Sequence, residues 1–148
     1  FSAVARKSTS IPFPYLHLSY PNEVRGIVVR SSSRASANIN CQASAEDGKA
    51  QKCVARDISI GGALIALREP MGMTGEKLML TLPVRIHETE HILTLNCVIR
   101  SLNTDRSAAN QAPVSLLGLS FENMTGQDTL VISTLLYQNI VSDNDYIE

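Results

Sequence analysis

Two short stretches carry side chains suited to binding a phosphorylated, planar ligand. The first, "VRSSSRAS", places Arg30 and Arg34 four residues apart, and the second, "RDISIGG", contains Asp57-x-Ser59-x-x-Gly62. A guanidinium group donates two parallel hydrogen bonds to phosphate oxygens, or to O6 and N7 of a guanine. A carboxylate accepts from donors on a base edge, a serine adds a hydroxyl, and glycine lets a ligand approach the backbone. The two stretches together therefore indicate a small anion site.

The overall charge requires such a site to be local. The chain has 148 residues, with 13 basic and 14 acidic side chains and a net charge of −1. A surface that binds duplex nucleic acid is usually strongly basic, so we expect no nucleic-acid partner. The segment 25–34 holds Arg25, Arg30 and Arg34 and no acidic residue, and it is the one place where positive charge gathers around the motif.

Catalytic chemistry is not indicated. "HETEH" (87–91) matches the HExxH pattern of zinc proteases, which requires both histidines on one face of a helix. Here it joins two segments with strand periodicity, so we interpret it as an exposed hairpin turn. We find no nucleophile–base pair, no metal site and no paired catalytic carboxylates. The sequence thus favours a binding domain over an enzyme, with no metal and no cofactor.

The cysteines and the hydropathy indicate a protein without disulfides or membrane spans. Cys41, Cys53 and Cys97 are odd in number and widely spaced, and they form neither a disulfide framework nor a CxxC pair. We interpret them as core-side thiols in a reducing cytoplasm. No run of about 18 apolar residues is present. The chain begins at Phe1 rather than Met, so we expect a fragment or a processed product.

Most of the chain has the periodicity of β-strands. Segments 37–43 and 49–58 flank Asp47-Gly48, for which we predict a two-residue hairpin turn with positive φ at both positions. A short buried-type strand is expected next, and strict period-two alternation then recurs in three more segments. These four strands are predicted at 62–67, 77–86, 91–100 and 115–121, with a polar loop at 101–114. Six such strands favour an all-β closed antiparallel barrel or a sandwich.

The two ends of the chain differ from this pattern. "TGQDTLVISTLLYQNIV" (125–141) predicts one amphipathic helix, with Thr125 and Asp128 resembling a capping box. Its apolar residues recur at helical spacing: Leu130, Val131, Leu135, Leu136 and Ile140. We expect residues 1–24 to be the end of a preceding domain plus a linker, with "YLHLSY" as a strand, and residues 142–148 to be an acidic tail.

The order Arg-x-x-x-Arg, then Asp-x-Ser-x-x-Gly, then strands and a helix resembles the PilZ domain, a bacterial receptor module for cyclic di-GMP. The resemblance covers residues 25–141 and implies a six-stranded antiparallel β-barrel followed by one C-terminal helix. The linker also resembles the junction in flagellar-brake proteins, where "YLHLSYP" would be the last strand of a partner domain. The family implies cyclic di-GMP as the ligand, bound at phosphate and guanine by Arg30 and Arg34, with a pocket on the barrel face lined by Asp57, Ser59 and Gly62.

This resemblance implies a bacterial cytoplasmic sensor that controls motility or the switch to sessile, biofilm growth. Binding would order the segment 25–34, swing the preceding domain and change docking on a partner such as the flagellar motor. Assembly of the protein into a homo-oligomer is also compatible with this resemblance. Val29 stands where some members carry a further arginine, so we expect one ligand per domain.

Several alternatives stay open. The arginines can be solvated loop charges, Asp57 and Ser59 can form a simple turn, and Gly61-Gly62 can be a bulge without a ligand. We take Arg56 as an exposed strand residue. The alternative function is a ligand-independent protein-interaction barrel that keeps the motif without using it.

Overall fold

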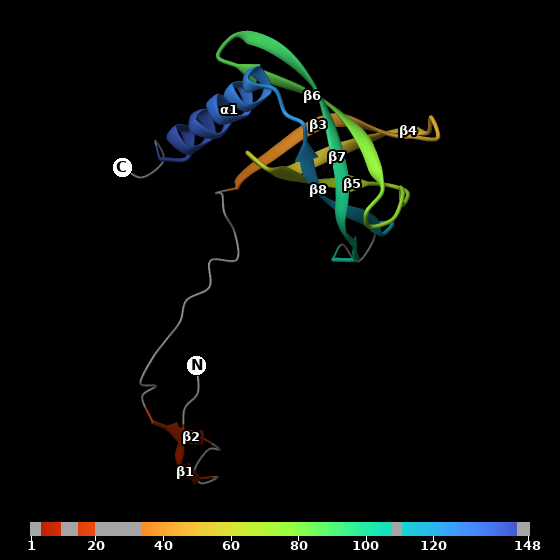
Figure 1. Ribbon diagram of the computed structural model, residues 1–148. Coiled ribbons are helices and arrows are strands. Elements are labelled where there is room, and N and C mark those ends of the chain that lie inside the picture. The colour runs from red at the N-terminus through yellow and green to blue at the C-terminus, as the bar shows by residue number, and fades with distance from the viewer. Residues whose placement is uncertain (1–3, 10–14, 20–33, 108–110, 145–148) are drawn as a thin grey trace. The chain divides into compact units, whose positions relative to one another are not determined.

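The computed structural model describes residues 4–9, 15–19, 34–107 and 111–144, and the chain divides into two compact units between Ser31 and Ser32. The first unit contains a two-stranded antiparallel ribbon of β1 (Ala5–Thr9) and β2 (Tyr15–Leu18) (Figure 1). The strand expected from "YLHLSY" is therefore present, and its partner β1 was not predicted.

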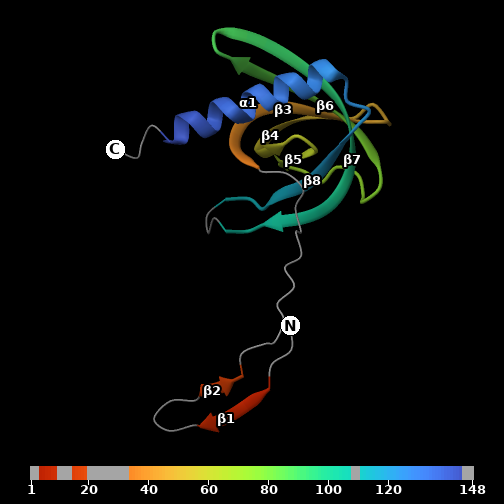
Figure 2. The same cartoon turned by 60° about the vertical axis from the view of Figure 1, so that its left-hand side comes forward.

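The second unit is a closed barrel of six antiparallel strands in the order β3-β4-β5-β8-β7-β6 (Figures 1 and 2). The strands are β3 (Ala35–Ala45), β4 (Ala50–Ser59), β5 (Gly62–Leu67), β6 (Lys77–Ile86), β7 (Thr89–Asp105) and β8 (Val114–Glu122). The six strands expected from periodicity are confirmed, and the closed ring decides for the barrel against the sandwich.

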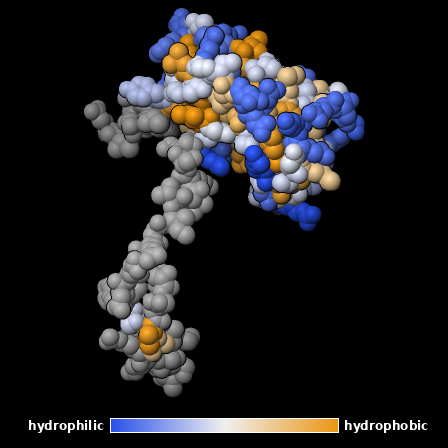
Figure 3. Space-filling model, in the orientation of Figure 1, coloured by the Kyte–Doolittle hydropathy of each residue, from blue (hydrophilic) through white to orange (hydrophobic). Residues whose placement is uncertain are grey.

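The barrel interior is filled by every second residue of the strands, as period-two alternation requires. In β6 the inward side chains Leu78, Leu80, Leu82 and Val84 are all at most 4% exposed. Inward residues of the other five strands belong to the same core, and each fully buried aliphatic side chain contributes about 1.5–3 kcal/mol. On the face of the molecule in Figure 3, hydrophobic residues are interspersed with hydrophilic ones.

The β3–β4 hairpin differs from the prediction by one residue. Ala45 N–H donates to the Lys49 carbonyl (2.8 Å), which encloses a three-residue loop, and within it Gly48 alone has a positive φ (+85°). The expected two-residue turn was therefore wrong. A three-residue loop with glycine in the left-handed region is a common alternative, and the Asp47 carboxylate supports it by accepting from Lys49 N–H (3.0 Å). The change shifts the register of the whole hairpin by one residue.

Strand β7 is longer than predicted and runs to Asp105, so the expected loop at 101–114 begins five residues late. Pairing between β7 and β8 skips Arg100 and resumes at Ser101. A bulge of this kind changes which residues face outward, and the polar sequence beyond it was therefore interpreted as a loop. A hairpin turn is present where "HETEH" was predicted to form one, but it is shorter than 87–91: β6 ends at Ile86 and β7 begins at Thr89, so only His87 and Glu88 form the turn.

Helix α1 (Gly126–Asn144) follows the barrel and extends three residues beyond the predicted end. The capping box is confirmed: Asp128 N–H donates to Thr125 Oγ1 (3.1 Å), and Thr125 N–H donates to Asp128 Oδ2 (3.0 Å). Both bonds satisfy N–H groups that have no partner within the first helical turn. No helix in the described part of the chain is long and apolar enough to cross a bilayer.

The helix packs against β6, β3 and β4, beside the seam where β3 and β6 close the barrel (Figure 2). That seam is short, with pairing only from Gln42 to Ala45 on β3. The buried helical residues Val131, Ile132, Leu135 and Leu136 join the barrel core. Leu130, which the predicted apolar stripe included, is 66% exposed, whereas Ile132, which it omitted, is fully buried.

Candidate anion-binding site

The structure brings the two halves of the motif together on the outside of the barrel. Pairing of β3 with β4 sets Ser36 opposite Asp57, so Arg34 at the entrance of β3 lies beside Asp57. Arg34 Nη1 is 3.8 Å from Asp57 Oδ2, with the two side chains 46% and 25% exposed. Arg30 lies outside the described residues, as do Arg25 and Val29.

The contact between Arg34 and Asp57 is loose. At 3.8 Å and with both groups partly in water, such an ion pair is worth roughly 0–1 kcal/mol. Opening it therefore costs little. A ligand that carries both an anionic group and hydrogen-bond donors can then take the guanidinium and the carboxylate separately.

Asp57 faces outward because β4 contains a bulge just before it. The pairing of β4 with β5 skips from Ala55 to Asp57, and the pairing with β3 is irregular at the same level. As a result Ala55 and Ile58 both point into the barrel and are fully buried. In a regular strand without this bulge, strict alternation from Ala55 would turn Arg56 outward and Asp57 inward.

Ser59 and Gly62 form the tight turn between β4 and β5. They pair directly, and Ser59 Oγ donates to the Gly62 carbonyl (3.2 Å). Ser59 is 6% exposed. Its hydroxyl proton is therefore used in the hydrogen bond across the turn, and its oxygen can still accept a hydrogen bond.

The glycine of the motif is required by a neighbouring strand. A Cβ on Gly62 would lie 2.1 Å from the Leu119 carbonyl oxygen of β8, whereas a Cβ on Gly61 would meet nothing within 4 Å. Among the described glycines, positive φ occurs at Gly48, Gly72 and Gly75. Close approach of β8, rather than backbone conformation, therefore excludes a side chain at Gly62.

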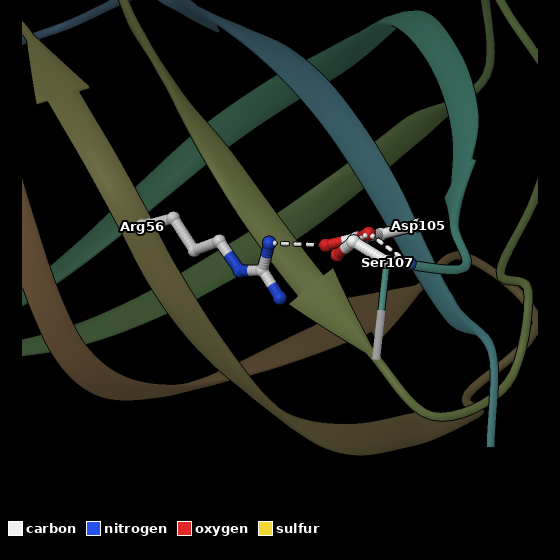
Figure 4. Close-up of polar contacts among 3 residues, drawn as sticks. All are labelled: Arg56, Asp105 and Ser107. Carbon is white, nitrogen blue, oxygen red and sulfur yellow. Dashed lines mark hydrogen bonds and ion pairs between the residues drawn. The ribbon is translucent and has the colours of Figure 1, made fainter. Parts of the chain in front are cut away.

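A second ion pair lies next to the site (Figure 4). Arg56 Nη1 is 2.8 Å from Asp105 Oδ2, and Asp105 Oδ1 accepts from Ser107 N–H (3.0 Å) and from the Ser107 hydroxyl. The Ser107 bonds and the Arg56 guanidinium hold the pKa of Asp105 well below its usual range. Arg56 is an exposed residue of β4, as expected, and it also ties β4 to the end of β7. The prediction ended β7 before Asp105, so this pair was not foreseen.

The outer surface beyond Asp57 continues across three more strands, through a leucine, a glycine and a serine that sequence reasoning missed. Across β5, β8 and β7 the residues level with Asp57 are Leu64, Gly118 and Ser101. A Cβ on Gly118 would lie 2.3 Å from Ser101 Oγ, so the serine side chain occupies that space. In the adjacent row, Arg100 Nε donates to Ser120 Oγ (2.8 Å). These residues lie on three strands, and only the sheet order places them next to the motif.

The described residues contain no group of three or more His, Cys, Asp or Glu side chains placed to hold a metal ion. The histidines of "HETEH" belong to a turn and the start of a strand, and the helix that the HExxH chemistry requires is not formed there.

A family model of the PilZ domain matches residues 28–138. Compared with proteins of curated function, the sequence has no significant match. Among solved structures, the Bacillus subtilis inhibitor of motility (MotI/DgrA) is similar with a TM-score of 0.72 and 17% identity, covering 99% of this chain and 67% of that one.

Two further similar structures are complexes with c-di-GMP. The PilZ domain of Escherichia coli YcgR with c-di-GMP gives a TM-score of 0.66 at 13% identity, covering 79% of this chain and 95% of that one. The K. pneumonia MrkH complex with c-di-GMP gives a TM-score of 0.64 at 16% identity, covering 98% of this chain and 66% of that one. The chain thus spans about two thirds of MotI and of MrkH, and these similarities show a shared fold.

Proposed function

Since the chain belongs to the PilZ domain family, we propose that it is a sensor of cyclic di-GMP that binds the nucleotide on the outer face of the barrel. The observation that carries this proposal is the position of the Arg34 guanidinium beside the Asp57 carboxylate. The c-di-GMP complexes of YcgR and MrkH, which share the fold, support the choice of ligand.

The chemistry of the ligand matches the groups present. Cyclic di-GMP carries two phosphate charges and two guanine bases. We assign Arg34, together with Arg30, to the phosphates and to guanine O6 and N7, which accept the two parallel bonds of a guanidinium. Asp57 accepts from the N1–H and N2–H₂ donors of guanine, and Ser59 and Gly62 form the edge of the site where the chain turns.

Little free energy is lost when the Arg34–Asp57 ion pair opens to admit a ligand. The Arg34–Asp57 pair is partly exposed and loose, so ligand contacts replace an interaction worth at most about 1 kcal/mol. Hydrogen bonds to charged groups contribute roughly 1.5–3 kcal/mol each. The exchange of one weak ion pair for several charge-assisted bonds is therefore favourable.

The output we propose is a change in docking on a protein partner. Ligand binding draws the segment 25–34 onto the barrel and so changes the position of residues 1–24, taken as the end of a preceding domain plus a linker, relative to the sensor at 25–141. The acidic tail was expected at 142–148, but residues 142–144 belong to helix α1, and the rest of that segment lies outside the described residues. The similarity to an inhibitor of motility makes the flagellar motor of a bacterial cell the first partner to test, by analogy only.

Calorimetric titration of the protein with cyclic di-GMP tests this proposal, with GMP and cyclic di-AMP as ligand controls. The informative variant is Arg34→Ala, and the matched control is Arg85→Ala, which removes an exposed arginine from β6. Loss of one charge-assisted contact of about 2 kcal/mol lowers affinity about thirtyfold.

We expect guanine-selective binding that weakens in Arg34→Ala and is unchanged in Arg85→Ala. Binding that is equal in the two variants would remove Arg34 from the site. Wild-type protein that gives no heat with cyclic di-GMP would favour the ligand-independent interaction barrel instead.

A further inference from the structure

Two of the three cysteines meet inside the barrel. Cys41 in β3 and Cys53 in β4 are direct partners in the antiparallel register, and their sulfur atoms are 3.1 Å apart. They are 7% and 4% exposed. Their separation in sequence gave no sign of this, because the predicted two-residue turn would have set Cys41 opposite Val54.

The geometry of this pair suits a covalent bond. Directly opposed residues in an antiparallel sheet have Cα atoms about 4.5–5.5 Å apart, within the range of about 4.4–6.8 Å found in disulfides. The Cβ atoms of such residues, at about 4.5–5.5 Å, need to approach by no more than about 1 Å. The folded chain therefore already holds the two thiols in a position that a disulfide can adopt.

The surroundings of the pair make one sulfur the better nucleophile. Cys41 can donate to the Cys53 carbonyl (3.5 Å), which leaves the Cys53 thiol to donate to the Cys41 sulfur. The hydrogen bond from Cys53 lowers the pKa of Cys41. The same interaction and burial raise the pKa of Cys53. Cys97 makes no such pair, and burial raises its pKa to about 12.

Both cysteines also belong to the lining of an open hollow. This hollow, of about 2070 Å³, lies beside the β3–β4 hairpin. Because little of either side chain is exposed, we infer that a small oxidant enters from this hollow.

We propose that Cys41 and Cys53 form a reversible, intramolecular cross-strand disulfide when the protein meets a peroxide. The Cys41 thiolate attacks one oxygen of hydrogen peroxide, the O–O bond breaks, and the released hydroxide takes up the thiol proton as water. The Cys53 sulfur then attacks the Cys41 sulfenic acid, the S–O bond breaks, and a second water leaves with the Cys53 proton. Two thiols are oxidised by two electrons in total, and one peroxide is reduced to two waters.

This bond would fix the register of β3 against β4 beside the bulge that turns Asp57 outward. The inference does not depend on the proposed ligand. It assigns a redox-sensitive disulfide to the barrel itself. A thiol reductant such as dithiothreitol reduces this bond again.

The test is to treat the folded protein with hydrogen peroxide, unfold it and count free thiols. We expect the count to fall from three per chain to one, with a monomeric product, a cross-linked peptide containing Cys41 and Cys53, and full recovery in dithiothreitol. In Cys97→Ala, the matched control, the count falls from two to none. In Cys53→Ala no cross-linked peptide forms.

A second measurement asks whether the fold already accommodates the bond. The oxidised protein is expected to melt about 5–15 °C higher than the reduced protein, because the bond restricts the unfolded chain. Three free thiols after treatment, a bond that involves Cys97, disulfide-linked dimers as the main product, or a lowered melting midpoint would each overturn the proposal.

Discussion

Arg56 and Asp57 are adjacent in β4, yet they belong to two ion pairs of different character. Arg56 holds Asp105 at 2.8 Å, and that carboxylate also accepts two bonds from Ser107. Asp57 meets Arg34 at 3.8 Å, and within the described residues no side-chain hydrogen bond reinforces that contact. We infer that the first pair braces the barrel and that the second is free to open.

Asp57→Asn should weaken cyclic di-GMP binding without unfolding the barrel. The amide keeps the shape of the side chain but loses the charge and one acceptor, so we expect affinity to fall about tenfold or more. The free energy of unfolding should change by less than about 1 kcal/mol, because the pair with Arg34 is partly exposed. Calorimetry and thermal melts measure the two effects, and Glu90→Gln, an exposed site on β7, is the control. Unchanged affinity would place the ligand elsewhere.

The Arg56–Asp105 pair should make stability depend on acidity. The pKa of Asp105 is lower in the folded protein than its unfolded value of about 4, so its contribution is present above about pH 4 and is lost as the pH falls toward the folded-state pKa. The difference in melting midpoint between the wild type and Asp105→Asn should therefore be largest near neutral pH and shrink below about pH 4. Glu88→Gln, in the exposed β6–β7 turn, should show no such trend. A difference that stays constant with pH would rule out this role.

Gly62→Ala should destabilise the barrel far more than Gly61→Ala. The new methyl group at Gly62 would lie 2.1 Å from the Leu119 carbonyl oxygen, so β5 and β8 must separate, whereas the methyl at Gly61 meets open space. Overpacking of this kind costs typically about 1–3 kcal/mol. Chemical denaturation of both variants measures the difference. Equal stability of the two would show that β8 moves aside without cost.

One cyclic di-GMP should bind per chain. Val29 offers no third guanidinium for a second, stacked nucleotide, so the stoichiometry from calorimetry is expected near one. Val29→Arg is the informative variant, because it restores the residue that some family members carry. A value near two in the wild type would contradict this prediction.

The strand pattern made the barrel predictable, but the bulges decided the details. Alternation in β6 marked its inward residues correctly, since one wet and one buried face produce a strict period of two. The same rule fails where a residue is inserted: at Arg100 it hid the last third of β7, and at Arg56 it obscured the orientation of Asp57. An inserted residue has no signature in hydropathy.

The residue types of the site were predictable from the sequence, but the contacts that distant parts of the chain make with them were not. The order of the motif indicated that Arg34 and Asp57 act together, and the register places them side by side. The reason for Gly62 was not accessible, because the atom that excludes a side chain belongs to Leu119, 57 positions later in the chain. The helix was misjudged at Leu130 for a similar reason, since the barrel surface rather than the helical period selects the buried stripe.

The short seam of the barrel gives the C-terminal helix a protective role. Only residues 42–45 of β3 pair with β6, so the first half of β3 and the last part of β6 have no strand partner across the seam. Helix α1 packs against both strands there. Unpaired strand edges are templates for association with other chains. A chain shortened to end before Gly126 is therefore expected to expose two such edges and to aggregate, with light scattering rising before the barrel itself unfolds.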